Sequence, residues 1–159
     1  MGDVERSLVL DQFRALIEYE RIVREDEGLA KESGRHEKQI ERKVHVLVMT
    51  DACLPTPALG EAPLGVHLLL NYELPVKKEA YVRRIGACFG PAAAAAIDKV
   101  SDGSGVRGGM GSSPVCSPGH GGGIVVNFLT ASEVPLLRSI EEGCGICMDE
   151  MPIHICELL

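Results

Sequence analysis

Residues at the ends of short apolar runs are the first candidates for chemistry. Thr50 and Asp51 directly follow the run 44–49, which reads VHVLVM. A short run rich in β-branched residues is typical of a buried parallel strand, and open α/β sheets place their ligands at the carboxyl ends of such strands. A second group is basic and falls within eight positions: Lys77, Lys78, Arg83 and Arg84. These side chains fit either an anion-binding face or an ordinary solvated surface.

Cysteine spacing near the end of the chain raises a metal alternative. Cys144 and Cys147 are separated by two residues, and His154 and Cys156 follow them. A thiolate pair at this spacing can bind zinc, and the later histidine or cysteine could complete a tetrahedron. Because only one residue separates His154 from Cys156, the pattern departs from common zinc sites. We favour reduced thiols, so no metal is predicted.

The glycine-rich stretch has no phosphate-binding pattern. Gly103-x-Gly105 does not join a predicted strand to a predicted helix, which a nucleotide-binding loop requires. The whole segment 101–122 is rich in Gly, Ser and Pro and is predicted to be a disordered insertion. The five alanines before it, at 92–96, are predicted to form a turn of helix with Pro91 in its first position.

The elements that would position these residues alternate between strands and helices. Strands are predicted over 44–49, 66–70 and 124–129. A helix is predicted over 4–17, with these side chains facing inward: Val4, Leu8, Leu10, Phe13 and Ile17. A second helix is predicted over 77–85. A third begins after Ser132, which is expected to cap it, and has Val134, Leu137 and Ile140 inward. Gly28 and Gly34 are expected to break the charged segment after the first helix, before a second short helix ending near Lys43. Residues 144–159 are predicted to end the chain as a short extended piece.

Bulk composition fits one α/β domain spanning 1–159. The 159 residues are 45% hydrophobic and 25% charged, close to the average for globular proteins. The net charge of -7 argues against a free-standing nucleic-acid binder, which normally has a basic footprint. No signal peptide or membrane-spanning run is recognised, so we expect an intracellular protein, cytoplasmic or nuclear, without a membrane partner.

Four segments, in order, resemble the C-terminal RecA-like domain of DEAD-box RNA helicases, nearest the translation-initiation-factor branch. Met1-Gly2-Asp3 with Glu5-Arg6 and 11–14 is similar to the first family helix, and 46–51 to the strand ending in Thr-Asp. Residues 71–75 are similar to the family motif Asn-Tyr-Asp-x-Pro, and residues 81–86 are similar to Tyr-x-His-Arg-x-Gly. The last strand, helix and tail of the family domain are matched by 123–130, 137–142 and 149–159, respectively. The resemblance implies a RecA-like open parallel sheet with flanking helices, lacking the first strand and helix of the family domain.

Departures from the family pattern bear on catalysis. The family follows Thr-Asp with Ala-Arg-Gly-x-Asp, whose Asp holds the ribose, whereas this chain has Leu-Pro-Thr-Pro-Ala at 54–58. The family motif His-Arg-x-Gly-Arg-x-x-Arg keeps Arg84 and Gly86 here, but Ala87 and Gly90 replace its arginine fingers. Such fingers contribute roughly a thousandfold or more to the rate. The family's phosphate loop and Asp-Glu-Ala-Asp box belong to an N-terminal domain that this sequence does not contain.

The resemblance also suggests roles for single residues. Arg6 and Thr50 match family residues that contact the RNA backbone, and backbone contacts need only charge and hydrogen-bond donors. The alternative for Arg6 is that it is an ordinary solvated residue of a helix. The alternative for Thr50 is that its hydroxyl only bonds a local partner at the end of the strand. Asp51 is expected to orient the loop after its strand, and Arg84 and Gly86 are motif remnants. No catalytic residue is assigned.

The expected function is therefore that of a non-catalytic helicase remnant, a low-affinity RNA-contacting or protein-interaction module. No cofactor is expected, although the family uses ATP and Mg. Two rival hypotheses remain open: an active ATP-dependent RNA helicase, as family membership implies, and a fragment that is stable only when docked on a partner protein.

Overall fold

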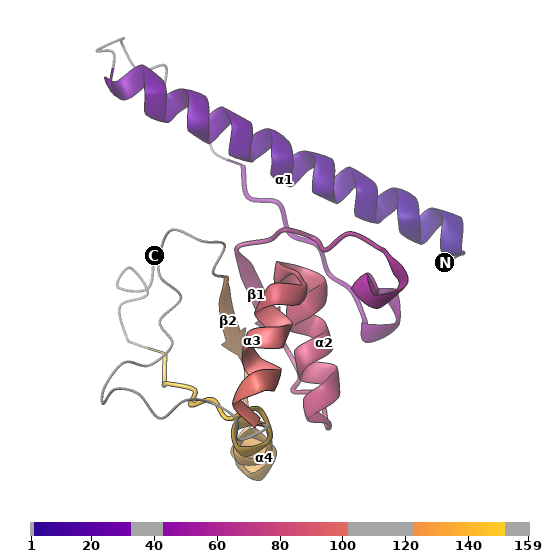
Figure 1. The fold of residues 1–159 in the computed structure, drawn as a ribbon, viewed down its shortest axis with the longest axis vertical. Helices are drawn as coiled ribbons and strands as arrows, with labels where there is room; N and C mark the ends of the chain where they lie inside the picture. Colours follow the sequence, from indigo (N-terminus) through magenta and orange to yellow (C-terminus); the bar gives the residue numbers. More distant parts are fainter. Residues whose placement is uncertain (1, 33–42, 102–122, 152–159) are drawn as a thin grey trace.

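The computed structural model describes residues 2–32, 43–101 and 123–151. A two-stranded parallel sheet is formed by β1 (Leu68–Asn71) and β2 (Ile124–Asn127), in register from Leu68 with Ile124 to Asn71 with Asn127. Around it lie the helices α1 (Asp3–Glu32), α2 (Lys78–Phe89), α3 (Pro91–Ser101) and α4 (Val134–Cys144), as Figure 1 shows. The predicted class, an open parallel α/β sheet with flanking helices, is confirmed in this small form.

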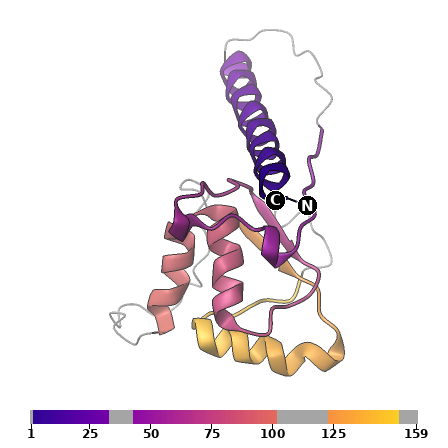
Figure 2. The same ribbon diagram turned by 90° about the vertical axis from the view of Figure 1, so that its right-hand side faces the viewer.

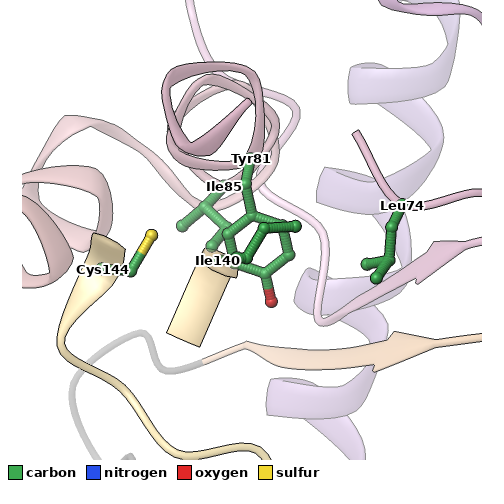
Figure 3. Close-up of a cluster of buried hydrophobic side chains, with 5 residues drawn as sticks. All are labelled: Leu74, Tyr81, Ile85, Ile140 and Cys144. Atoms are coloured by element: carbon green, nitrogen blue, oxygen red, sulfur yellow. The ribbon is translucent and has the colours of Figure 1, made fainter. Parts of the chain in front are cut away.

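The main core lies between the sheet, α2 and α4. Its buried members are Leu74, Tyr81, Ile85, Ile140 and Cys144, shown in Figure 3. Leu69 of β1 and Val125 of β2 pack against this cluster. Among the described residues the sheet has two strands. Helices close the face that carries Leu69 and Val125, and burial of these side chains supplies most of the local stabilisation.

A second core attaches α1 to the rest of the chain. Leu10 and Phe13 of α1 are buried against Leu64 and Cys88, and Ile17 packs beside them. These three α1 positions, at i, i+3 and i+7, share one face of a helix. Val4 and Leu8 point elsewhere and are 83% and 58% exposed, so their predicted inward orientation is wrong.

The first helix is longer than the sequence indicated. α1 runs through Gly28 to Glu32, so the break predicted at Gly28 does not occur. A single glycine costs a helix only about 1 kcal/mol, which flanking turns with good helix formers can offset. Figure 2 shows the C-terminal part of α1 extending away from the other helices. Gly34 and most of the predicted second short helix lie outside the described residues.

The strand predicted over residues 44–49 is wrong. The structure assigns them no strand, and Val44, Val46 and Val48 are 86%, 75% and 90% exposed. Leu47 and Met49, by contrast, pack against the second core. The alternation of a strand is therefore kept, but the segment pairs with neither β1 nor β2, and its valine side is exposed.

The other predicted elements are confirmed with shifted ends: β1 begins and ends slightly later than 66–70, β2 ends before 129, and α2 continues to Phe89. The alanine run belongs to α3, which begins at Pro91. The predicted disordered segment 101–122 lies outside the described residues except for Ser101, the last residue of α3. Residues 145–151 form no helix or strand, and the rest of the predicted extended tail lies outside the described part.

Ser132 is not the N-cap of α4: that position is Glu133, and Thr130 caps the 3-10 turn that precedes the helix. The Glu133 carboxylate accepts hydrogen bonds from the Thr130 backbone N–H at 2.8 Å and from its hydroxyl at 2.7 Å. A short 3-10 turn, Ala131–Glu133, then leads into the helix. Val134 is 45% exposed, contrary to its predicted inward position, whereas Leu137 and Ile140 pack inward as predicted.

We expect Thr130→Ala to lower the free energy of unfolding by about 1 kcal/mol, because the 3-10 turn before α4 loses the capping hydroxyl bonded to Glu133. Ser132→Ala is the comparison: it removes only the exposed hydroxyl 2.9 Å from that of Thr130 and should change the free energy of unfolding by less than about 0.5 kcal/mol. Urea unfolding of both variants measures the difference. Equal losses would contradict the assignment of Thr130 as the cap.

Candidate functional site

The candidate site is the carboxyl edge of the sheet together with the loop 50–66. Asp51 begins a short 3-10 turn, Asp51–Cys53, in this loop. Asn71 and Asn127 are the last residues of the two strands and face each other in register. Polar side chains from the loop, both strands and α2 therefore meet at one edge, as expected for an open parallel sheet.

Arg84 joins the polar groups at this edge through four hydrogen bonds. Its Nε and Nη2 donate to the two carboxylate oxygens of Asp51, each at 2.7 Å. Its Nη1 donates to Asn71 Oδ1 at 2.9 Å and to the carbonyl oxygen of Glu73 at 2.8 Å. A guanidinium offers five N–H donors, so Arg84 has little hydrogen-bonding capacity left for a ligand.

The hydrogen-bond network continues across the sheet. The Asn71 amide nitrogen donates to Asn127 Oδ1 at 2.9 Å, and Asn127 donates to the Tyr81 hydroxyl at 3.4 Å. Asn71 is only 3% exposed, so its amide needs these partners. The bidentate contact of Arg84 holds the pKa of Asp51 below its usual value and keeps the carboxylate ionised. Asp51 thus anchors its loop to α2, consistent with the expected orienting role.

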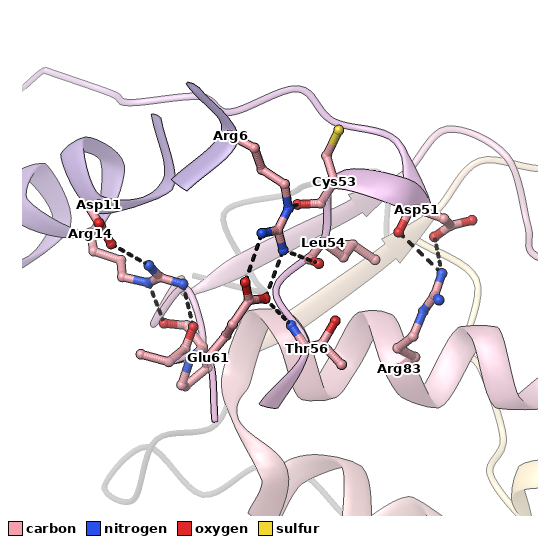
Figure 4. Close-up of polar contacts among 11 residues, drawn as sticks. Arg6, Asp11, Arg14, Asp51, Cys53, Leu54, Thr56, Glu61 and Arg83 are labelled. Atoms are coloured by element: carbon pink, nitrogen blue, oxygen red, sulfur yellow. Dashed lines mark hydrogen bonds and ion pairs between the residues drawn. The ribbon is translucent and has the colours of Figure 1, made fainter. Parts of the chain in front are cut away.

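Arg6 makes a second clamp, between α1 and the loop (Figure 4). Its Nη1 and Nη2 donate to the two carboxylate oxygens of Glu61, each at 2.8 Å, and Nη2 also donates to Leu54 O at 2.9 Å. Its Nε donates to Cys53 O at 3.2 Å. The Glu61 carboxylate also accepts from Thr56 N at 2.7 Å. Chiefly through Arg6, the pKa of Glu61 falls to about 2.

Arg14, two turns after Arg6, attaches the same helix face to the loop. Its guanidinium donates to Pro63 O at 3.2 Å and also to Ala62 O. Figure 4 places both arginines on the side of α1 that faces the loop. The loop 50–66 is therefore held by α1 on one side and by Arg84 of α2 on the other.

Arg6 and Thr50 both contact Cys53, but at different atoms. Thr50 is exposed, and its hydroxyl lies 3.8 Å from Cys53 Sγ, while Arg6 donates to the carbonyl oxygen of the same residue. A phosphate that contacts both side chains would have to span Cys53. Arg83, with its side chain 50% exposed, lies on the other side of Asp51, donating to Asp51 O at 3.3 Å. The RNA role of these residues stays a prediction.

Gly86 has a packing role. A Cβ placed on it would lie 3.2 Å from the Cβ of Ala94, so its missing side chain allows α2 and α3 to approach closely. The positions where the family carries its fingers are also enclosed: Ala87 is fully buried, and Gly90 is buried near Pro63. Leu64 N donates to Ala87 O at 2.8 Å, so the loop covers this end of α2.

Sequence reasoning missed Glu61, Arg14 and the asparagine pair. One usable signal existed for Glu61, since it is the only acidic residue between Asp51 and Glu73. Asn71 directly follows the apolar run 66–70, which is the same signal that selected Thr50 and Asp51. Asn127 lies within the run 124–129 and has no such signal.

The zinc hypothesis is not tested by this structure. Within residues 2–32, 43–101 and 123–151, no group of His, Cys, Asp and Glu is arranged to hold a metal ion. Cys144 is buried and Cys147 is exposed, but His154 and Cys156 lie outside those ranges. In the same ranges, no helix combines the length and apolar character needed to cross a bilayer.

Comparison with known proteins identifies relatives for most of the chain. It is 30% identical over 114 residues to the ATP-dependent RNA helicase eIF4A of Mycosarcoma maydis, and 29% identical to those of Pyricularia oryzae and Phaeosphaeria nodorum. The matched part is 72% of this chain in each case, but it is 20% of the first relative and 21% of the other two. No family model matches the chain, and no solved structure matches it. The chain therefore contains a DEAD-box helicase-like region that spans about one fifth of these relatives.

Proposed function

We propose that this chain is a non-catalytic remnant of the C-terminal RecA-like domain of a DEAD-box helicase, retained as a scaffold for binding. The observation that carries the proposal is the enclosure of positions 87 and 90. In an active family member these positions supply guanidinium groups to the nucleotide phosphates. Here they are a buried alanine and a buried glycine beneath the loop that carries Leu64.

Arg84, the arginine of this family motif that the chain keeps, supports the same conclusion. Arg84 makes four hydrogen bonds to groups of its own chain, two of them to a carboxylate. An arginine that stabilises phosphoryl transfer must direct its donors at the charge that develops on the phosphate. Arg84 directs them at Asp51, Asn71 and Glu73, so its role is to hold the sheet edge together.

We expect no RNA-stimulated ATP hydrolysis from the purified chain, because the positions of the arginine fingers offer no charge and are enclosed. Phosphate release should equal a no-enzyme blank with or without RNA, while an active eIF4A assayed in parallel gives turnover. Adding arginine through Ala87→Arg with Gly90→Arg should not restore activity. Release that scales with the concentration of the chain and survives repurification would contradict the proposal.

Contact with the RNA backbone is a second candidate function, favoured by the position of Arg6 and Thr50 on Cys53. Such contact would be independent of sequence and sensitive to salt. The relevant obstacle is Glu61, whose carboxylate already occupies Arg6 in the bidentate geometry that a phosphate would use. RNA binding through this pair therefore requires a phosphate to replace the Glu61 carboxylate.

A further inference from the structure

Met148, four residues after the end of α4, is hydrogen-bonded through both its main chain and its sulfur. Its backbone N–H donates to Glu141 Oε1 of α4 at 2.8 Å. Its Sδ accepts from Asn127 Nδ2 of β2 at 3.2 Å, and the Tyr81 hydroxyl of α2 lies 4.0 Å from the same sulfur. Met148 therefore joins the segment after α4 to three different elements of the fold.

The segment 145–151 has no regular structure of its own to hold it in place. Its backbone is attached at Glu141, whose carbonyl oxygen accepts from Ile146 N at 3.1 Å and whose carboxylate accepts from Met148 N. The side chains of Ile146 and Met148 pack against the main core. Met148 thus contributes a main-chain contact, a packing contact and a sulfur contact to the attachment of this segment.

The donor that faces the sulfur has a fixed direction. Arg84 donates to Asn71 Oδ1, so the Asn71 amide nitrogen must point at Asn127 Oδ1. Asn127 must then direct its own amide nitrogen towards Met148 and the Tyr81 hydroxyl. Asn127 cannot turn to suit a changed side chain at position 148 without breaking its bond to Asn71, which is almost fully buried.

A thioether in this position is open to one specific reaction, because Met148 is only partly buried. A sulfur lone pair attacks one oxygen of hydrogen peroxide, the O–O bond breaks, and hydroxide leaves. Proton transfer from the new S–OH group to the hydroxide gives methionine sulfoxide and water. Sulfur is oxidised by two electrons and the peroxide is reduced, and the product side chain is polar and chiral.

The added oxygen does not fit the site that the thioether occupies. On the side of Asn127, the sulfur and the amide nitrogen are already in contact at 3.2 Å. Elsewhere around the sulfur, the oxygen would press a polar group against the apolar cluster on which Met148 packs, and such contacts destabilise a core. Oxidation should therefore displace the side chain and, with it, the backbone that Glu141 holds.

We propose that Met148 is an oxidation site, at which a peroxide converts the thioether to the sulfoxide and thereby releases residues 145–151 from the carboxyl end of β2. The change is reversible in principle, because methionine sulfoxide reductases remove the oxygen again. The inference is independent of the proposed lack of ATP hydrolysis and of any contact with RNA.

The test compares the full chain before and after treatment with hydrogen peroxide. Peptide mass mapping measures the fraction of Met148 that gains one oxygen atom, and hydrogen exchange measures the protection of the Ile146 and Met148 amides. Both amides should exchange at least about tenfold faster in the oxidised chain, because their bonds to Glu141 are lost. A methionine sulfoxide reductase should restore the original exchange rates, whereas dithiothreitol, which reverses only thiol oxidation, should not.

Three variants assign the effect to one sulfur. Met148→Leu keeps a similar apolar volume but has nothing to oxidise, so peroxide should not change its exchange rates. Met151→Leu removes a methionine that is 48% exposed, and Cys147→Ser removes the exposed thiol beside Met148; both variants should respond like the wild type.

Three results overturn the proposal. The first is a folded wild-type chain in which Met148 stays unmodified while the exposed Met151 is oxidised. The second is an oxidised Met148 with unchanged or slower exchange at the two amides. The third is a response to peroxide that persists in Met148→Leu or disappears in Cys147→Ser.

Discussion

Replacing Arg84 by alanine should lower the free energy of unfolding by about 2–4 kcal/mol. The substitution removes four hydrogen bonds at the carboxyl edge of the sheet. It leaves the Asp51 carboxylate without its strongest partner, and it removes a donor to the side chain of Asn71, which is almost fully buried. Loss of a partner by a buried polar group costs more than the net contribution of the bond itself.

Arg83→Ala is the matched control for this prediction. Arg83 is the neighbouring residue of α2 and has the same charge, but its side chain is 50% exposed and its nearest Asp51 carboxylate oxygen is 3.9 Å away. Exposed ion pairs contribute little, so we expect a loss of less than about 1 kcal/mol. Chemical denaturation monitored by circular dichroism compares the two. Equal losses would mean that Arg84 acts only as a surface charge.

Glu61→Gln should raise the affinity for single-stranded RNA roughly tenfold at low salt, if Arg6 contacts the backbone. The substitution keeps the shape of the side chain but removes the charge that competes with phosphate for Arg6. The released guanidinium should add one phosphate contact, which steepens the dependence of log K on log salt by about one unit. Fluorescence anisotropy with a labelled homopolymer over a salt series measures both quantities.

The same ion pair makes a pH-dependent contribution to stability. The pKa of Glu61 is lowered to about 2 in the folded chain from 4.5, so its stabilising effect is present above about pH 4.5 and is lost as pH falls towards 2. RNA measurements near pH 7 therefore compare a fully ionised Glu61 with the neutral glutamine, and titration of this group does not contribute to the difference.

Two controls separate local release of Arg6 from a change in overall charge. Glu142→Gln makes the same change in net charge on the exposed surface of α4, where no ion pair of Glu142 is found among the described residues, and it should leave affinity nearly unchanged. Adding Arg6→Ala to Glu61→Gln should abolish the gain. If Glu61→Gln and Glu142→Gln bind RNA equally, Arg6 has only the structural role of joining α1 to the loop.

The sequence by itself determined most of the helices and both strands of the sheet, because their signals are local. Pro91 starts α3, and the helical period selected Leu10, Phe13 and Ile17 for the buried face of α1, although it also selected the exposed Val4 and Leu8. The apolar runs 66–70 and 124–129 predicted the two paired strands, with ends that differ from those of β1 and β2. The resemblance to the DEAD-box helicases, carried by short motifs in a fixed order, was also available without coordinates.

Only the tertiary structure decided which segments meet. An exposed run and a buried strand can have the same local pattern, and in the structure residues 44–49 pair with neither β1 nor β2 and expose their valines. The partner of Arg6 lies 55 residues away, in a proline-rich loop with no periodic signal. A single carboxylate in such a loop has no local feature that predicts its partner, since ion pairing depends on where the chain folds back. Glu61 therefore became part of the site only through the packing of α1 on the loop.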